Sequence, residues 1–138
     1  MVVTAELALK TQGDTDMHDV TEAVAEQVRA SGVRDGSVTV FCPSSTSALT
    51  TIEFEDGALA DLRRALDELA PPSRDYQHNR RWGDGNGYAH LRAALLGPSL
   101  TVPFTAGTLR LGTWQQLLFI DFDNRPRDRR LILQIIGD

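Results

Sequence analysis

The stretch QQLLFIDFDNRPRDRRLILQII, which spans Gln115–Ile136, decides the class of fold. Its first part, Gln115–Phe122, is apolar and contains branched and aromatic side chains, which is typical of a strand. The residues Asp123–Pro126 are of the types that form a turn, and Leu131–Ile136 is predicted to be the last strand. The longest apolar run is LLFI, at Leu117–Ile120, which is far too short for a membrane-spanning helix.

Further strands are predicted upstream. Ala106 and Gly107 have the character of a hairpin turn between two short β-like segments, and we expect these segments to continue into a β-meander with the two strands above. An alternation of apolar and polar residues, or a β-branched run, marks the other strands. The predicted segments are Val2–Leu9, Ser37–Phe41, Ser47–Phe54, Leu100–Phe104 and Thr108–Leu111.

Helical spacing of apolar residues marks three segments. Valines at positions 20, 24 and 28 predict a helix that runs to about Ala30, is preceded by a turn in which Asp16 or Asp19 caps it, and ends at Gly32. Ala58–Leu69 carries leucines at helical spacing, and His90–Leu96 is a shorter candidate. The order of elements indicates an α+β fold, and 138 residues fit one domain, residues 1–138.

The bulk composition narrows the classes of function. With 14 basic and 19 acidic residues the formal net charge is −5, which argues against a nucleic-acid binder with a basic face. No signal peptide or membrane segment is recognisable, so a cytoplasmic location and no membrane partner are expected. Cys42, the only cysteine, follows an apolar strand and is interpreted as a buried structural thiol.

The segment Tyr76–Leu91, YQHNRRWGDGNGYAHL, is the strongest candidate for a functional site. Long polar loops inside a small domain usually have a function. Alternating glycines around Asp84 and Asn86 would let the backbone approach a ligand closely. If the loop doubles back, His78 and His90 meet and could bind a metal ion or a small anion. The alternative is that each histidine caps a helix or binds nearby backbone, and that Asp84 and Asn86 only form turns.

Several charged residues outside this loop also allow two interpretations. Glu53 and Glu55 lie two positions apart and would share one face of a strand, as a proton-sharing or metal-binding pair or as a solvated strand end. The arginines at positions 125, 127, 129 and 130 are accompanied by aspartates at positions 121, 123 and 128, so we expect local pairing and solvation there. Arg92 lies within the candidate site, and we expect it to anchor a phosphate if the ligand is a phosphate ester.

Three ordered blocks of the sequence carry a resemblance to a known family. They are STSALTTIEFEDG (Ser45–Gly57), YQHNRRWGDGNGYAHLRAALLGPSLTVP (Tyr76–Pro103) and LGTWQQLLFIDFDNRPRDRRLILQIIG (Leu111–Gly137). On these blocks the chain resembles the YjbQ-like family, also called the secondary thiamine-phosphate synthase family. The resemblance implies a mixed, largely antiparallel sheet folded into a sandwich-like core, with two to three flanking helices. It also implies a homotrimer.

The resemblance further implies a His/acidic pocket. The residues expected to be catalytic are His78, His90, Asp84 and Glu53, and those expected to bind the ligand are Ser45, Thr46, Asn86, Arg92, Trp114 and Gln115. A divalent metal, zinc or magnesium, is expected on His78, His90 and Glu53. Ser45 stands where many members have a histidine, so Glu53 or water would have to complete the metal shell.

The resemblance implies an enzyme that joins a pyrimidine diphosphate to a thiazole phosphate with loss of pyrophosphate, as a weak or incidental activity. The partner would be a small, phosphorylated molecule. The rival hypotheses are a non-catalytic trimeric module that holds a metal or a phosphorylated metabolite, and a purely structural subunit.

Overall fold

The first and last strands of the chain pair along their whole length. In the computed structural model, which describes residues 1–138, Val2 lies opposite Ile136 and Thr11 lies opposite Arg127. The last strand also pairs with a third strand on its other edge, and the five-stranded sheet has the order β1-β8-β3-β5-β6 with every pair antiparallel. Its strands are β1 (Val2–Thr11), β8 (Arg127–Gly137), β3 (Gly36–Phe41), β5 (Ser99–Thr105) and β6 (Thr108–Leu109).

A second sheet is built around the most apolar strand. Its order is β2-β7-β4, again antiparallel, with β2 at Asp16–Asp19, β7 at Gln116–Asp121 and β4 at Ser47–Ile52. Leu117 and Phe119 of β7 point into a core shared with the large sheet, whereas Leu118 and Ile120 point into a second core. Both faces of β7 are therefore covered, which explains why its sequence is a continuous apolar run.

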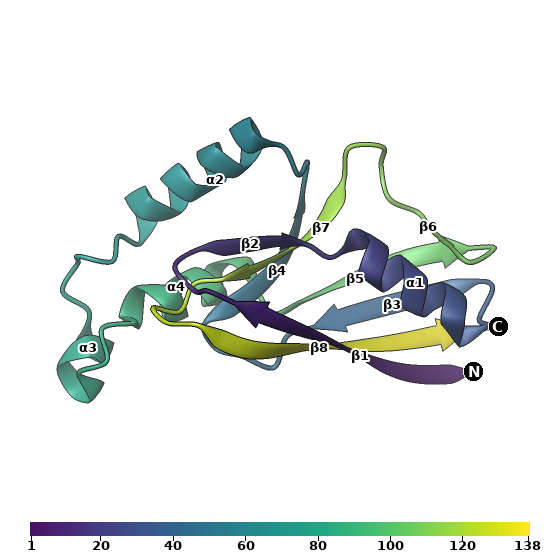
Figure 1. Ribbon diagram of the computed structural model, residues 1–138, viewed down its shortest axis with the longest axis horizontal. Coiled ribbons are helices and arrows are strands. Elements are labelled where there is room, and N and C mark those ends of the chain that lie inside the picture. Colours follow the sequence, from purple (N-terminus) through teal and green to yellow (C-terminus); the bar gives the residue numbers. More distant parts are fainter.

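Four helices complete the molecule, at α1 (Thr21–Ser31), α2 (Asp56–Leu69), α3 (Gln77–Trp82) and α4 (Gly87–Leu96). The first helix buries Val24 and Val28 in the core of the large sheet. The other three follow one another at the opposite end of the molecule (Figure 1), where α2 and α4 cover the second core with Leu66 and Ala89 among their buried residues. None of the helices is long and apolar enough to cross a membrane.

The α+β class and the antiparallel pairing are confirmed, but the strand order was not foreseen. The predicted β-meander is wrong, because β7 enters the small sheet and β8 lies between β1 and β3. All strand pairs are antiparallel, so the sheets are not mixed. There are four helices, since α3 forms inside the stretch expected to be a loop, and β2 forms where a turn was predicted.

Local signals at two turns were read correctly. Gly32 ends α1 in the left-handed conformation, with φ +77°, as predicted for a glycine C-cap. Ala106 and Gly107 both have positive φ, +52° and +76°, which is the conformation of a two-residue hairpin turn between β5 and β6. The predicted cap of α1 is only partly confirmed, because the N-cap residue is Val20, which makes no side-chain capping bond, while Asp19 before it accepts a hydrogen bond of 3.0 Å from the backbone N–H of Thr21.

Candidate functional site

The carboxyl end of β7 leads into two carboxylates that are almost wholly buried, Asp121 and Asp123. Asp121 accepts a hydrogen bond of 2.6 Å from the hydroxyl of Thr11 on β1. It also accepts two from Arg129 on β8, from Nε at 2.7 Å and from Nη2 at 3.0 Å. A side-on pair of this kind fixes the plane of the guanidinium as well as its charge.

Asp123 joins this pair to two loops. Its carboxylate accepts hydrogen bonds from Arg127 Nε at 2.9 Å, Thr46 Oγ1 at 3.2 Å and Asn86 Nδ2 at 3.3 Å. Arg129 Nη2 also donates to Thr46 Oγ1, at 2.8 Å. The loop before β4, the loop before α4 and the ends of β7 and β8 thus meet in one hydrogen-bonded network.

Both carboxylates are held in the charged form. Burial alone would raise the pKa of Asp121, but hydrogen bonds from Arg129, Thr11 and the backbone of Asp123 bring the pKa below its ordinary value. Burial opposes ionisation of Asp123 in the same way, and hydrogen bonds from the Asn124 backbone, Asn86 and Arg127 lower its pKa. The network therefore contains two buried negative and two positive charges at neutral pH.

A polar hollow of about 350 Å³ opens beside this network. Apart from one proline, every residue that lines it is polar. They are Pro43, Ser44, Ser45, Thr46, Asn86, His90, Asp123, Arg127 and Arg129. Both arginines use Nε and Nη2 on the aspartates, and Nη1 of each makes no hydrogen bond within the protein. These free N–H groups suit an oxyanion.

A side hollow of about 240 Å³ adjoins the polar hollow. It is lined by Ser44, Ser45, Ser47, His90, Ala93, Ala94 and Pro98, so three residues line both hollows. No aspartate, glutamate, lysine or arginine contributes to the side hollow.

Two histidines meet at the wall of the polar hollow. The ring centroids of His78 on α3 and His90 on α4 are 4.2 Å apart, with an angle of 38° between the planes. Asn79 Oδ1 accepts a hydrogen bond of 2.8 Å from the backbone N–H of Gly87, which ties α3 to the start of α4. A Cβ on Gly87 would lie 2.7 Å from Cβ of Tyr76, so only glycine permits this close approach.

The imidazole pair favours a neutral ring. Burial lowers the pKa of His90, and the neighbouring His78 lowers it further, because two positive rings in contact repel each other. Asp84 Oδ1 lies 3.5 Å from His78 Nδ1, which is longer than a normal hydrogen bond. A neutral imidazole beside a polar hollow can accept or donate a proton.

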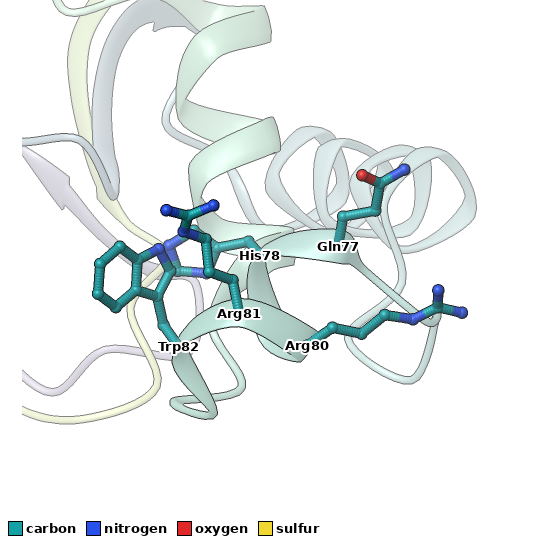
Figure 2. A pocket seen from close by; sticks show the side chains of 5 residues that line it. All are labelled: Gln77, His78, Arg80, Arg81 and Trp82. Carbon is teal, nitrogen blue, oxygen red and sulfur yellow. The ribbon is translucent and has the colours of Figure 1, made fainter.

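A further hollow, of about 490 Å³, lies against α3 and is a different kind of feature. It is lined only by Gln77, His78, Arg80, Arg81 and Trp82, all from one short helix (Figure 2). The side chains of His78, Arg81 and Trp82 gather on one side, while Gln77 and Arg80 extend away from them. Trp82 is 67% exposed and does not belong to a core. No residue is shared with the polar hollow, so we regard it as a surface depression.

The structure brings together most of the predicted residues of the two motif loops. Ser45, Thr46, Asn86 and His90 line the polar hollow. His78 and Asp84 lie beside it through the imidazole pair. These contacts join the segment before β4 to the loop between α3 and α4, as the sequence blocks suggested.

Three predicted residues lie elsewhere. Glu53, Trp114 and Gln115 are at the opposite end of the β4–β7 pair, where Gln115 Nε2 donates to Thr51 Oγ1 at 3.3 Å. The length of β4, at about 3.3 Å per residue, puts roughly 17 Å between them and the polar hollow. Glu53 is exposed, and Trp114 is 71% exposed. Glu55 caps α2 through hydrogen bonds from the backbone N–H groups of Gly57 and Ala58, so it does not pair with Glu53.

The expected role of Arg92 as a phosphate anchor is not compatible with its position. The residue is 1% exposed and donates hydrogen bonds to Ala70 O, Thr15 Oγ1 and Asp67 Oδ1, at 3.0, 3.0 and 2.9 Å. Its guanidinium is therefore committed to the protein interior. It joins α4 to the end of α2 and to the loop between β1 and β2.

The expected metal set does not assemble within one chain. Glu53 is remote from His78 and His90, and no group of three or more His, Cys, Asp or Glu side chains has the geometry to hold a metal ion. The groups that do lie together are the imidazoles of His78 and His90 and, 3.5 Å from His78, the carboxylate of Asp84. This arrangement suits proton transfer better than a closed metal site.

Sequence reasoning missed the residues that hold the hollow together. The expected local pairing is confirmed, because Arg127 pairs with Asp123 and Arg129 with Asp121. The expected solvation is wrong, since both aspartates are buried and Arg129 is largely so. A signal was present in the period of two along each strand. Arg127 and Arg129 are separated from the buried Leu131 by an even number of positions, so they lie on the same face of β8, and Asp121 lies on the same face of β7 as Phe119. The charges therefore continue the inward faces of β7 and β8.

Comparisons with known proteins agree on one family. Residues 5–138 match the model of the family described as UPF0047 protein YjbQ-like. A UPF0047 protein of Archaeoglobus fulgidus is 43% identical over 131 residues, covering 95% of this chain and 99% of that protein. The UPF0047 protein YugU of Bacillus subtilis is 31% identical, with 95% and 97% covered.

Solved structures give the same result. A YbjQ-like protein of unknown function from Sulfolobus solfataricus superimposes with a TM-score of 0.94 at 30% identity, covering 100% of this chain and 99% of that one. An uncharacterised conserved protein of the YjbQ/UPF0047 family from Clostridium acetobutylicum gives a TM-score of 0.87 at 38% identity, covering 96% and 99%. With its fold and nearly its whole sequence matched, this chain belongs to the YjbQ-like UPF0047 protein family.

Proposed function

We propose that the polar hollow binds a small phosphorylated molecule and that His90 transfers a proton to or from it. The observation that carries the proposal is the pair of arginines on the inward face of β8. Their Nε and Nη2 atoms are held by buried aspartates, so the guanidiniums are fixed before a ligand arrives. Each retains a free Nη1. Preorganised donors of this kind bind an oxyanion without reorganising.

The loop before β4 would supply the remaining contacts. Ser44 accepts a hydrogen bond from the backbone of Thr46, at 3.2 Å, and its own hydroxyl hydrogen stays available to a ligand. Ser45 lies next to it in the wall of the hollow. Hydroxyl groups and guanidiniums together form the mixture of donors that phosphate groups meet in proteins.

His90 has the properties of a general acid–base group. Because its pKa is lowered, the ring is neutral at physiological pH and can accept a proton from a bound ligand. His78 would modulate this step through the ring contact, and Asp84 would stabilise a positive charge on His78. In this proposal Asp84 acts through His78, so it is a positioning residue.

The condensation implied by the family resemblance is the first reaction to test. Both substrates carry phosphate groups, and the released pyrophosphate is an oxyanion that the two arginines would suit. Magnesium would enter with the diphosphate, since Mg²⁺ is commonly held by one or two carboxylates together with substrate phosphates. Asp123 would be the carboxylate nearest to it among the lining residues.

The alternative is a non-catalytic homotrimer that only binds the phosphorylated molecule. The exposed Trp114 and the position of Glu53 favour a role for a second copy, because these residues could reach a hollow only from a neighbouring chain. Sedimentation velocity would test the trimer, for which a single species of three times the chain mass is expected. A monomer would rule out both the trimer and any role for Glu53 at the hollow.

Calorimetric titration with inorganic phosphate and with pyrophosphate tests the binding site directly. We expect the Arg127→Gln variant to bind each anion at least about tenfold more weakly, because it loses one charge-assisted contact. The matched control is Arg110→Gln, which removes an exposed arginine outside the hollow and should leave affinity unchanged. Equal weakening in both variants would show that the anions bind through general charge, and absence of binding would reject the proposal.

Turnover separates the enzyme from the binding module. In the enzyme, His90→Gln should abolish turnover, whereas phosphate should still bind through the two arginines. A protein that binds phosphate but turns over no pyrimidine diphosphate and thiazole phosphate pair, with Mg²⁺ present, would be the binding module.

A further inference from the structure

We infer that the ligand has two parts, a phosphate group in the polar hollow and a small, mainly apolar body in the side hollow. This inference rests on the proposed function and extends it to the class of molecule, namely a phosphate ester of a small and otherwise uncharged alcohol. The two hollows share Ser44, Ser45 and His90. The two hollows therefore adjoin, and the inference is that one molecule occupies both.

The walls of the two hollows differ in chemistry. The polar hollow has two arginines and an aspartate, whereas the side hollow has Ala93, Ala94 and Pro98 and no aspartate, glutamate, lysine or arginine. A charged group in the side hollow would lose hydration without gaining a partner. An apolar group there would be removed from water, which is favourable.

One buried polar group lies in the wall of the side hollow. Ser47 is 1% exposed, and its hydroxyl has no hydrogen-bond partner in the protein. Buried hydroxyls are usually hydrogen-bonded, so an orphan in the wall of a hollow points to a partner that is not part of the chain. The body of the ligand should therefore carry one polar atom that can pair with Ser47.

The volume limits the size of this body. About 240 Å³ is available. At roughly 30 Å³ for each water-sized group, the hollow has room for about eight non-hydrogen atoms. His90 lies where the two hollows join, so it would face the bond between the phosphate and the body. This position agrees with a proton transfer to or from the ester oxygen.

The depression against α3 is a weaker candidate for the second part. It shares no lining residue with the polar hollow, and its side chains come from a single helix of six residues. The side hollow, in contrast, is formed by the loop before β4, by α4 and by the residues that follow α4.

The experiment compares inorganic phosphate with n-butyl phosphate by calorimetric titration. Burying a methylene group is worth about a factor of four in affinity, so four partly buried carbons should make n-butyl phosphate bind at least about tenfold more tightly than phosphate. In Ala94→Phe the added ring fills the side hollow. This variant should bring the ratio of the two affinities close to one while phosphate affinity stays as in the wild type.

A matched control uses Ala60→Phe, since Ala60 is an exposed alanine in α2 that lines neither hollow. It should keep the wild-type ratio. Ala94→Leu is the second variant if Ala94→Phe does not fold, as judged by circular dichroism, and it should lower the ratio by a smaller factor.

The outcomes separate the two proposals. If the wild type binds phosphate but prefers n-butyl phosphate by less than twofold, the side hollow is not a subsite and only the present inference fails. The inference also fails if Ala60→Phe lowers the ratio as much as Ala94→Phe does. If neither probe binds, the proposed phosphate site itself is wrong.

Discussion

Arg129 and Asp121 form a side-on ion pair, with Nε 2.7 Å from Oδ2 and Nη2 3.0 Å from Oδ1, between β8 and the end of β7. The two strands belong to different sheets. The pair therefore links the sheets at the end of the molecule where the polar hollow opens. Asp121 is fully buried and the side chain of Arg129 is 14% exposed. If either residue lost its partner, water could not reach the remaining charge well enough to compensate it.

Removal of one member of this ion pair should lower the stability of the protein. We expect Asp121→Asn to lower the free energy of unfolding by about 3 kcal/mol, because it leaves the Arg129 charge poorly compensated in a buried position. Urea denaturation measures the change. Asp128→Asn is the control, since Asp128 is exposed, and it should alter stability by no more than about 0.5 kcal/mol. Equal effects of the two substitutions would mean that the buried ion pair contributes no more to the free energy of unfolding than an exposed aspartate does.

Acid should weaken the protein through the same network. The pKa values of Asp121 and Asp123 are lowered in the folded state, so below about pH 4 the unfolded chain takes up protons that the folded chain does not. Their contribution is complete above about pH 5 and is lost as the pH falls through the folded pKa values. Urea denaturation between pH 3 and pH 6 should show this loss. In Asp121→Asn the decline should be shallower, and a curve parallel to the wild type would contradict the assignment.

The contact between the two histidines predicts a titration that can be measured by NMR. The pKa of His90 should be lower than the ordinary value of about 6.5, because of burial and of His78. His78→Ala removes one of these causes and should move the pKa of His90 upward. The ring signals of His18, which lies on β2, serve as the reference and should not change. A downward shift of the His90 titration would show that the contact has been misjudged.

The lowered pKa also affects stability near neutral pH. The unfolded chain protonates at His90 before the folded chain does, so this contribution is complete above about pH 6.5 and is lost as the pH falls through the folded pKa. A phosphate bound beside the ring should raise the pKa of His90, because its negative charge favours the imidazolium. Calorimetry in buffers of different ionisation enthalpy should therefore detect proton uptake on phosphate binding, and His90→Gln should abolish it.

Arg92 is predicted to be structural. In Arg92→Gln the buried acceptors Thr15 Oγ1 and Ala70 O lose their donor, and we expect a loss of about 3 kcal/mol in thermal or urea unfolding. Arg63→Gln removes an exposed arginine that also reaches Thr15, and its effect should be smaller than about 1 kcal/mol. The folded Arg92→Gln protein should bind phosphate as the wild type does. A tenfold weaker affinity would restore Arg92 as a phosphate anchor.

The α+β class, the glycine that ends α1 and the hairpin at Ala106 could be predicted from the sequence. Each of these depends on residues close together in the chain: a glycine that tolerates positive φ, or an apolar period over one element. The segment Tyr76–Leu91 was also recognisable from composition as a candidate site, and the meeting of His78 and His90 was expected if this segment folded back. The short helix α3 was not foreseen, since its apolar residues are too few to show a period.

The burial of particular charged residues depends on contacts between segments far apart in the chain. The run from Asp121 to Arg130 has the composition of a solvated turn. Its aspartates can be buried because Thr11, Thr46 and Asn86, which come from distant segments, donate hydrogen bonds to them. The same holds for Arg92, whose acceptors lie 22 and 77 positions away, and for Glu53, which the length of β4 separates from the histidines. The periodicity of apolar residues in a strand or helix indicates which face of that element a residue lies on. Which other residues it contacts on that face depends on the order of the strands in the sheets. That order depends on long-range packing, which local sequence does not encode.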